Sequence, residues 1–325
     1  MRKLIIGADG GATSTKLVAT DDRGTVLGYG KCAGINYNYI GMDRSRQNLK
    51  DGVDRLLVDL GMPDYDHISI GHCALSDEAT DEEKRLFCGH LFDPKMMTLH
   101  SDAHMTLYGT TLQNPGIVIV SGTGTMCVGR NIHNRTLTAG GWGFLLGDEG
   151  SSYYIAWCGI LSAVRHFEGR GEHTAITEKL MQYCKISNMR DLINWLYVPS
   201  VDFSRIAGFA GYVVECAREG DNVAAEIVCR AVDALIETGS YLIKELDMTN
   251  GTIGIYGGLF EYNPDITETF SDKMKRLHPG FSIGFPEFSP ELGAIIGYFI
   301  SNGSLTDLII NTIRDTKTEA RGGLS

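Results

Sequence analysis

The stretch LIIGADGGATST, residues 4–15, decides the fold, because an apolar run there ends in a glycine turn rich in hydroxyl side chains. A second stretch of the same form, GIVIVSGTGT, occupies residues 116–125. Glycine lets a backbone turn with positive φ and approach a ligand closely. Successive free N–H groups in such a turn make a concave site for anions. Two copies of this turn predict a polyphosphate held by the two halves of a duplicated fold.

Composition and charge narrow the class of protein. The chain has 325 residues, which favours two domains, and its net charge of −11 argues against non-specific binding to nucleic acid or to an acidic membrane. No apolar run approaches the roughly 20 residues of a transmembrane helix, and no signal peptide is visible. The eight cysteines are scattered without a CxxC pair, which indicates reduced thiols. We therefore expect a cytoplasmic protein.

The predicted elements follow one order twice. Three strands are expected within residues 4–30, followed by alternating helices and strands up to residue 112. Strands restart at residue 116, and a long helical region follows, with one of its helices at 204–219 and another at 222–246. Strands and helices then alternate to residue 316. This order predicts an α/β fold of two ribonuclease-H-like halves with mixed sheets and a cleft between them.

The boundary between the two halves is expected near residue 115, where Asn114, Pro115 and Gly116 interrupt the pattern. The predicted domains are an N-terminal lobe, residues 1–115, and a C-terminal lobe with helical insertions, residues 116–325. The last helix is expected to be able to pack back on the N-terminal lobe.

The first glycine turn carries the first predicted ligand contacts. Asp9 ends a strand that faces the anion site, where a carboxylate is suited to hold magnesium. Four residues then offer backbone amides to phosphates: Gly10, Gly11, Ala12 and Thr13. An ordinary β-hairpin turn is the alternative interpretation. Neither a P-loop nor a G-x-G-x-x-G motif before a helix fits the two turns, so the phosphates would be clamped by hairpins.

The second turn, with Gly122, Thr123 and Gly124, is the matching phosphate clamp. Further along, Gly257 and Gly258 follow a buried strand. Paired glycines at that place either present backbone to an adenine face or form a plain strand-to-helix turn.

Asp102 follows a short strand at the start of a predicted helix. A carboxylate there is suited to accept a proton from a substrate hydroxyl. It is equally suited to cap the helix. A third interpretation is a metal site, because His100, Asp102 and His104 occupy alternate positions.

Another glycine-rich run is a candidate ligand floor, since it brings backbone close to a neighbour. Gly140 and Gly141 begin the run, and Asp148 and Glu149 follow. The two acidic residues are suited to bind sugar hydroxyls or a metal, and equally to cap the next helix. Asn36 lies in an earlier loop, where an amide suits sugar hydroxyls or an acetamido group, although loops favour Asn in any case.

Taken in order, these motifs resemble the BadF/BadG/BcrA/BcrD ATPase family, and within it the N-acetylglucosamine kinases, which have the actin-like ATPase fold. The run GGWG at 140–143 followed by GDEGS at 147–151 is the most specific part of the likeness. The resemblance implies an ATP-dependent kinase in which Asp102 takes the proton of a sugar 6-hydroxyl and Asp9 organises Mg²⁺. It also implies further contacts, with the two glycine loops on the ATP phosphates, Gly257 and Gly258 on adenosine, and Asn36, Asp102, Gly140, Gly141 and Asp148 on the amino sugar.

One departure concerns Cys73 and Ala74, which stand where similar sugar kinases have a turn of smaller residues. An alternative function within the family is an activator ATPase with a subunit-bridging [4Fe–4S] cluster, for which Cys127 and Cys158 lie in the right region but lack the expected glycine contexts. The expected partner is a small-molecule sugar, with no nucleic acid and no membrane. A homodimer is left open.

Overall fold

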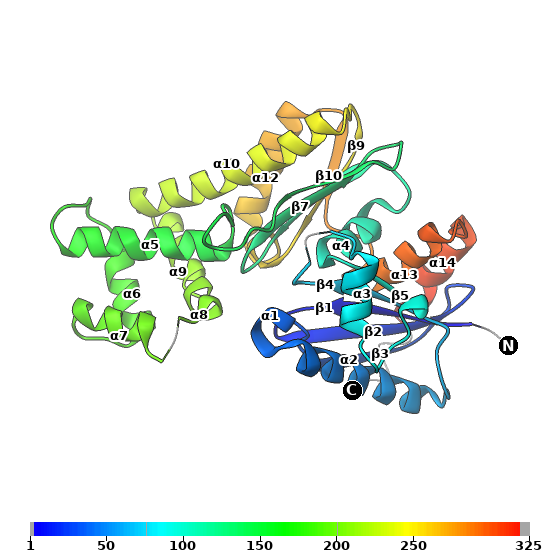
Figure 1. The fold of residues 1–325 in the computed structure, drawn as a ribbon. Helices are drawn as coiled ribbons and strands as arrows, with labels where there is room; N and C mark the ends of the chain where they lie inside the picture. Colours follow the sequence, from blue (N-terminus) through cyan, green and yellow to red (C-terminus); the bar gives the residue numbers. More distant parts are fainter. Residues whose placement is uncertain (1–2, 76, 200, 319–325) are drawn as a thin grey trace. The chain divides into compact units, whose positions relative to one another are not determined.

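Two five-stranded sheets form the frame of the protein (Figure 1). The computed structural model describes residues 3–75, 77–199 and 201–318. The first sheet has the order β3-β2-β1-β4-β5, and the second has the order β10-β9-β6-β7-β8. Read from its other edge, the second order repeats the first. This repetition confirms the predicted duplicated α/β fold.

The strands are β1 (Leu4–Gly10), β2 (Ser14–Asp21), β3 (Val26–Ala33), β4 (His67–His72), β5 (Met97–His100), β6 (Gly116–Ser121), β7 (Thr125–Arg130), β8 (Thr136–Gly140), β9 (Gly251–Tyr256) and β10 (Phe281–Gly284). The α-helices are α1 (Tyr37–Ile40), α2 (Met42–Leu60), α3 (Asp81–Cys88), α4 (Asp102–Thr111), α5 (Ser152–Phe167), α6 (Ile176–Cys184), α7 (Leu192–Tyr197), α8 (Phe203–Ala207), α9 (Ala210–Arg218), α10 (Asn222–Glu245), α11 (Gly258–Glu261), α12 (Pro264–Leu277), α13 (Pro290–Ser301) and α14 (Asp307–Thr316). Two 3₁₀ turns are η1 (Pro94–Met96) and η2 (Met189–Asp191).

Both sheets are mixed, as predicted. In the first sheet β1 pairs antiparallel with β2, and β2 with β3, while β4 runs parallel to β1 and to β5. In the second sheet β7 and β8 are antiparallel, and β9 and β10 are parallel. Hairpins join the antiparallel strands, whereas the parallel strands need helical crossovers.

Helices cover both faces of the first sheet because β1 is apolar on both sides. Ile6 and Ala8 pack with the buried residues of α2, whereas Ile5 packs with α13 and α14. A strand covered on both faces carries such a continuous apolar run. α13 lies so close that a Cβ at Gly7 would come within 2.2 Å of the carbonyl oxygen of Glu291. The glycine at position 7 is therefore required by the close approach of α13.

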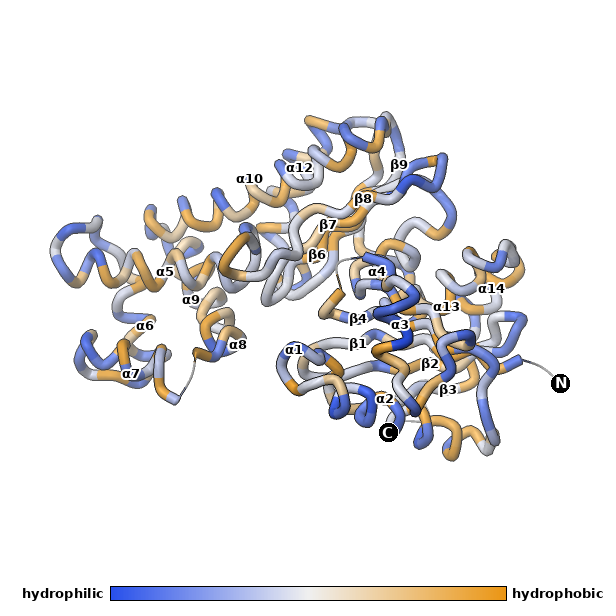
Figure 2. The backbone as a smooth tube through the Cα atoms, in the orientation of Figure 1, coloured by the Kyte–Doolittle hydropathy of each residue, from blue (hydrophilic) through white to orange (hydrophobic). Residues whose placement is uncertain are grey.

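The long helices bury one face. In α2 the buried residues Leu49, Val53 and Leu56 recur at helical spacing, and the helix ends at Gly61 in the left-handed conformation. Figure 2 shows hydrophobic and hydrophilic segments alternating along α2 and α10. This alternation is typical of amphipathic helices that cover a sheet.

The chain divides into two compact units. Unit 2 is Ile117–Gly284, and unit 1 contains the described residues up to Gly116 together with those from Phe285 onward. The division differs from the predicted C-terminal lobe of residues 116–325 at its far end. The physical reason is that Ile295 of α13 and Ile313 of α14 belong to the core that contains Ile5 and Val18.

Unit 2 has its own core, to which the strands of the second sheet and helices α5 to α12 contribute. The helix expected at 204–219 is two helices, α8 and α9. The carbonyl oxygen of Arg205 accepts a hydrogen bond from the Tyr183 hydroxyl at 2.7 Å. In an uninterrupted helix the same oxygen would also have to accept from the Phe209 amide. The Phe209 amide instead bonds the nearer carbonyl of Ile206, which ends α8.

Candidate active site

The first part of the candidate site lies at the carboxyl ends of the parallel strands of unit 1. Asp9 pairs in register with Gly71 of β4, and Gly71 pairs with His100 of β5. The strand order reverses between β1 and β4, and open α/β sheets bind ligands at such a point. Asp102 comes two residues after the end of β5.

Asp102 is the first residue of α4, and Ser101 is the N-cap of the helix, whose side chain accepts from the backbone N–H of His104. The capping role considered for Asp102 from the sequence therefore belongs to Ser101. A Cβ at Gly71 would lie 3.0 Å from the Asp102 Cα and 2.6 Å from the Met105 Cγ. Glycine at position 71 thus allows the first turn of α4 to rest on β4.

Negative charge gathers around Asp9. The pKa of Asp9 is raised to about 7, chiefly by burial, with the charge of Lys16 opposing the shift and the negative charges of Asp102 and Glu291 adding to it. The Lys16 Nζ lies 3.7 Å from the Asp9 Oδ2, across the β1–β2 pair. The pKa of Asp102 is also raised by burial, against hydrogen bonds from the first backbone amides of α4. Asp9 thus feels the negative charges of two further acidic side chains and the positive charge of one lysine, a setting that suits a cation.

A magnesium ion fits this charge balance. No group of three or more His, Cys, Asp or Glu side chains that could hold a metal is found among residues 3–75, 77–199 and 201–318. Mg²⁺ commonly keeps several waters and binds through one or two carboxylates plus substrate phosphates, so a single carboxylate such as Asp9 is a sufficient protein ligand.

The first glycine turn packs on the loop that carries Asn36. The amides of Gly34 and Ile35 donate to the carbonyl oxygens of Thr13 and Gly11, at 3.1 and 3.0 Å. A Cβ at Gly34 would lie 1.9 Å from the Ala12 carbonyl oxygen, so the two loops touch. These contacts use carbonyl oxygens of the turn and not the amides that the predicted phosphate contact requires.

Asn36 and Cys73 extend the group of side chains in unit 1. Asn36 is 8% exposed and caps α1, with its Oδ1 accepting from the Asn38 amide at 3.1 Å. The Cys73 amide donates to the Gly10 carbonyl at 3.0 Å. The pKa of the Cys73 thiol is raised to about 12, chiefly by burial and then by the charge on Asp102, while a hydrogen bond with Asn36 opposes the shift. The structure therefore brings Asn36 and Asp102 to the same thiol.

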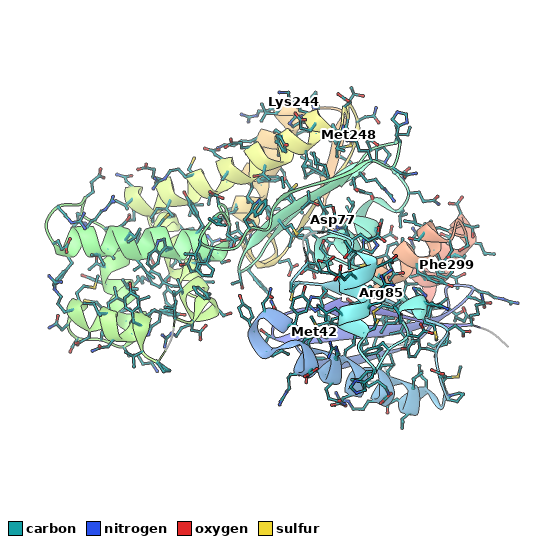
Figure 3. All side chains as sticks on the ribbon, viewed as in Figure 1. Met42, Asp77, Arg85, Lys244, Met248 and Phe299 are labelled. Atoms are coloured by element: carbon teal, nitrogen blue, oxygen red, sulfur yellow. The ribbon has the colours of Figure 1, made fainter. Side chains whose placement is uncertain are left out.

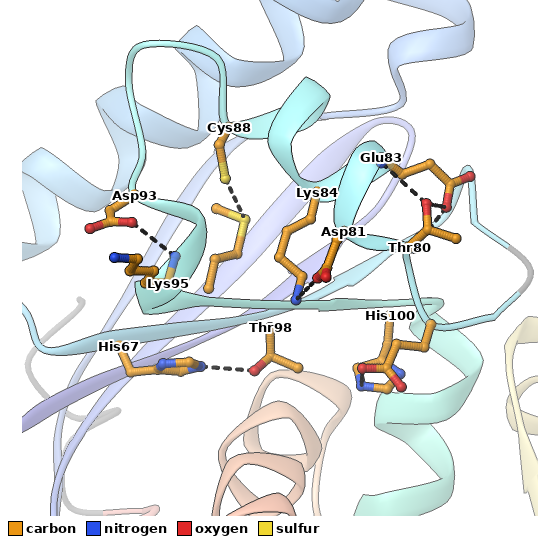
Figure 4. A network of polar contacts seen from close by, with 12 residues as sticks. His67, Thr80, Asp81, Glu83, Lys84, Cys88, Asp93, Lys95, Thr98 and His100 are labelled. Atoms are coloured by element: carbon orange, nitrogen blue, oxygen red, sulfur yellow. Dashed lines mark hydrogen bonds and ion pairs between the residues drawn. The ribbon is translucent and has the colours of Figure 1, made fainter.

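The two histidines beside Asp102 face acidic side chains. The His104 Nε2 lies 3.3 Å from the Asp77 Oδ1, and the His100 Nε2 lies 3.8 Å from the Glu78 Oε1. His100 stands at one end of β5, while His67 and Thr98 pair toward the other end (Figure 4). Within the described residues these histidines form no metal site, so the metal interpretation of His100, Asp102 and His104 has no support.

The second glycine turn, in unit 2, is held by the start of α5. The amides of Ser152 and Tyr153 donate to the carbonyl oxygens of Gly122 and Thr123, at 2.9 and 3.3 Å. The Ser121 hydroxyl donates to the Gly150 carbonyl at 2.8 Å. Hydrogen bonds on both sides thus give the turn a defined shape.

Gly257 lies directly against this turn. Its φ is +105°, and a Cβ there would lie 2.4 Å from the Ser121 carbonyl oxygen and 3.3 Å from the Gly122 amide nitrogen. The structure thus brings the residues predicted for adenosine beside those predicted for phosphate. Gly258 begins the short helix α11.

Asp148 also belongs to the second turn. Its Oδ1 accepts from the Thr125 amide at 2.9 Å, and a Cβ at Gly124 would lie 2.9 Å from either carboxylate oxygen. Burial raises its pKa, against the hydrogen bond from Thr125. Asp148 therefore braces the second glycine turn, and the cap of α5 is Ser151. Its predicted contact with sugar remains a prediction.

Gly140 and Gly141 have φ of +78° and +74°, and the Gly141 amide donates to the Thr125 carbonyl at 3.0 Å. The run that follows exposes Trp142 and Leu145, which are 73% and 82% exposed. The backbone at the end of β8 thus lies next to the second glycine turn. The prediction that this run contacts a ligand requires that placement.

Sequence reasoning missed two charged residues of this site. Lys16 could have been found, because the turn after β1 places residue 16 opposite residue 9 in the hairpin. Glu291 has no such signal, since it reaches the site through the packing of α13 on β1. No helix in the described part of the chain is long and apolar enough to cross a membrane.

Comparisons with known proteins agree with this arrangement. The chain is 27% identical over 310 residues to the N-acetyl-D-glucosamine kinase of Dictyostelium discoideum, covering 91% of this chain and 97% of that protein. It is 27% identical over 307 residues to the N-acetylmuramic acid/N-acetylglucosamine kinase of Clostridium acetobutylicum, covering 90% and 97%.

A solved structure from Chromobacterium violaceum, described as a candidate N-acetylglucosamine kinase, superposes with a TM-score of 0.72 at 19% identity, covering 90% of this chain and 98% of that one. This likeness supports the fold. The model of one family matches residues 6–296, which include both glycine turns and the first part of α13. The chain belongs to the BadF/BadG/BcrA/BcrD ATPase family.

Proposed function

We propose that this protein transfers the γ-phosphoryl group of ATP to the 6-hydroxyl of an amino sugar, with N-acetylglucosamine as the first candidate. The family is one of ATPases, and the two curated relatives are named as kinases of N-acetylglucosamine or N-acetylmuramic acid. Both relatives are matched over nearly their whole length, so the proposal concerns the whole chain.

The placement of Asp102 is the observation that carries the proposal. Its carboxylate stands at the first turn of α4, at the end of the parallel strands, with Asp9 close enough to feel its charge. A general base must come within hydrogen-bond reach of the hydroxyl that it deprotonates. The raised pKa makes Asp102 a stronger base, and it accepts the proton of the sugar hydroxyl as the oxygen attacks phosphorus.

The other residues position the reactants. Asp9 holds magnesium, which neutralises phosphate charge when bound. The amides of the first turn, Gly10 to Thr13, and of the second, Gly122 to Gly124, hold the phosphates, and Gly257 and Gly258 lie against adenosine. The sugar contacts are assigned to Asn36, Gly140, Gly141 and Asp148. Phosphoryl transfer depends chiefly on such positioning and charge stabilisation.

The alternative function, an activator ATPase with a subunit-bridging iron–sulfur cluster, draws no support from Cys127, one of the two cysteines considered for it, while the other, Cys158, is partly exposed. Cys127 is 1% exposed and belongs to the core of unit 2. A cluster shared between two subunits needs its ligands at the surface where the subunits meet, and Cys127 is not at a surface.

A coupled assay of ADP release tests the proposal. Hexoses and hexosamines are screened with ATP and Mg²⁺, and the product is located by ³¹P–¹H correlation NMR. We expect the highest kcat/KM with an N-acetylated amino sugar and phosphate on its 6-oxygen. Glucose is the matched control, because it differs from N-acetylglucosamine only in having a hydroxyl in place of the acetamido group. Sugar-independent ATPase activity with about two irons per chain after anaerobic purification would instead establish the activator function.

A further inference from the structure

Three polar side chains next to Asp102, those of Ser101, His104 and Asp77, contact one another in series. The Ser101 Oγ lies 2.8 Å from the Nδ1 of His104, and the Nε2 of His104 lies 3.3 Å from the Asp77 Oδ1. Ser101 is fully buried and His104 is 2% exposed. Asp77, labelled in Figure 3, belongs to the segment between β4 and α3. Side chains from two separate segments therefore meet at the first turn of α4.

These contacts determine which atom of Ser101 and His104 carries each polar hydrogen. The ionised Asp77 carboxylate only accepts, so the Nε2 of His104 carries the proton that faces it. The Nδ1 is then an acceptor, and the Ser101 hydroxyl donates to it. The Ser101 oxygen keeps lone pairs for the backbone N–H of His104, which donates to it at 3.4 Å. His104 thus fixes the hydroxyl that caps α4.

Backbone bonds tie the Asp77 segment to the same place. The Ser101 amide donates to the Asp77 carbonyl at 3.1 Å, and the Ala79 amide donates to the Leu99 carbonyl at 2.9 Å. The segment therefore runs along the end of β5.

We propose that His104 is a positioning residue, which orients the Asp102 carboxylate by holding the cap of α4. The inference rests on the proposed function, in which Asp102 is the base. Asp102 directly follows the N-cap residue Ser101, so a shift of the first helical turn displaces its carboxylate. A misplacement of about 1 Å near a reacting group can cost roughly 10²-fold in rate. His104 itself touches no substrate in this assignment.

Two substitutions at one position separate positioning from general stability. His104→Leu removes both polar contacts, whereas His104→Asn keeps an acceptor oxygen where Nδ1 stands. The matched control is His67→Leu, because the His67 Nε2 also contacts a hydroxyl, the Thr98 Oγ1 at 2.9 Å, toward the opposite end of the same two strands. All variants are made in the full chain.

The test measures kcat and KM with ATP, Mg²⁺ and N-acetylglucosamine, together with the melting temperature. We expect His104→Leu to lower kcat at least about tenfold with an unchanged KM for ATP, and His104→Asn to recover most of the loss. His67→Leu should lower the melting temperature but leave kcat within about twofold. If His104→Leu does not fold, Asp77→Ala at an exposed side chain carries the test, with an expected loss of about threefold in kcat.

The outcomes distinguish the two proposals. Wild-type kcat in the folded His104 variants and in Asp77→Ala, with Asp102→Asn inactive, overturns the positioning role and leaves the proposed function standing. Equal losses in His104→Asn and His104→Leu likewise overturn it, since the retained acceptor would then have no effect. Full turnover in Asp102→Asn, or no phosphorylation of any amino sugar by the wild type, overturns the proposed function and the positioning role with it.

Discussion

At the scale of single residues, the site of unit 1 depends on carboxyl groups whose ionised form is disfavoured by burial. Asp9 and Asp102 are both carboxylates with raised pKa values, and burial is the main cause for each. Lys16 is half exposed and offsets the charge only in part. Such perturbed groups gather where chemistry is done, because a base must be poised to take a proton.

His72 supports this site from beneath and should make the stability of the protein depend on pH. It is fully buried, its Nδ1 accepts from the Ala74 amide at 3.1 Å, and burial lowers its pKa to about 4. Between pH 6.5 and about 4 the unfolded chain therefore binds more protons at this residue than the folded chain. The stabilisation is complete above pH 6.5 and is lost as the pH falls toward about 4.

The substitution His72→Asn, which keeps an acceptor for the Ala74 amide, should remove this dependence. The difference in unfolding free energy between wild type and variant is expected to change by on the order of 3 kcal/mol between pH 7 and pH 4, given a pKa of about 4 in the fold. Urea unfolding at several pH values measures it. Subtracting the unfolding free energy of the variant from that of the wild type cancels the contribution of His67, whose pKa is also about 4. A difference that stays flat across this range would show that His72 does not titrate as proposed.

At the scale of elements, the position of Asp102 depends on how closely α4 packs on β4. Gly71→Ala would place a Cβ 3.0 Å from the Asp102 Cα, and backbone there cannot move without shifting the base. We expect a loss of about 1–3 kcal/mol in stability and at least about a tenfold loss in kcat. Denaturant unfolding and steady-state kinetics measure the two effects.

The control for this substitution is Gly211→Ala in α9, where an added Cβ meets nothing within 4 Å. It should gain up to about 1 kcal/mol in stability, because alanine favours the helix, and leave kcat unchanged. A Gly71→Ala variant with normal kcat would mean that α4 tolerates displacement without consequence for catalysis.

Elements with a strong periodic pattern could be predicted from the sequence. The helix at α3 and the strands β5 and β6 occur where their apolar spacing places them. The short helices α1 and α11 were not predicted, because four residues are too few for a 3.6-residue period to appear. Their positions follow from the glycines Gly41 and Gly257, which bound them with positive φ.

At the scale of the whole molecule, the sequence predicted the duplication and allowed the last helix to pack on the N-terminal lobe, but it assigned α13 to the C-terminal lobe. Both glycine turns were found from their repeated pattern, and the strand order confirms the duplication. α13 and α14 reach unit 1 only through tertiary packing, in which Ile295 and Ile313 meet the residues of β1 and β2. Glu291 enters the site by the same packing, and no local pattern of the sequence reports it.

Two polar residues, Asp148 and Ser101, hold backbone beside the predicted ligand sites. The contact of Asp148 with sugar stays a prediction, and the structure shows in addition that its carboxylate holds the second turn through the Thr125 amide. Ser101 was passed over although it caps the helix of the base. A polar residue beside glycine can serve the backbone as readily as a ligand, and only the contacts of each side chain tell the two apart.

The central claim is that Asp102 deprotonates the sugar hydroxyl in an ATP-dependent kinase. The most direct test compares the wild type with Asp102→Asn in the phosphorylation of N-acetylglucosamine, with ATP binding measured by calorimetry on the same samples. We predict a fall in kcat of at least about 10², the lower end expected for loss of a general base, with ATP affinity unchanged. Turnover near that of the wild type would contradict the account.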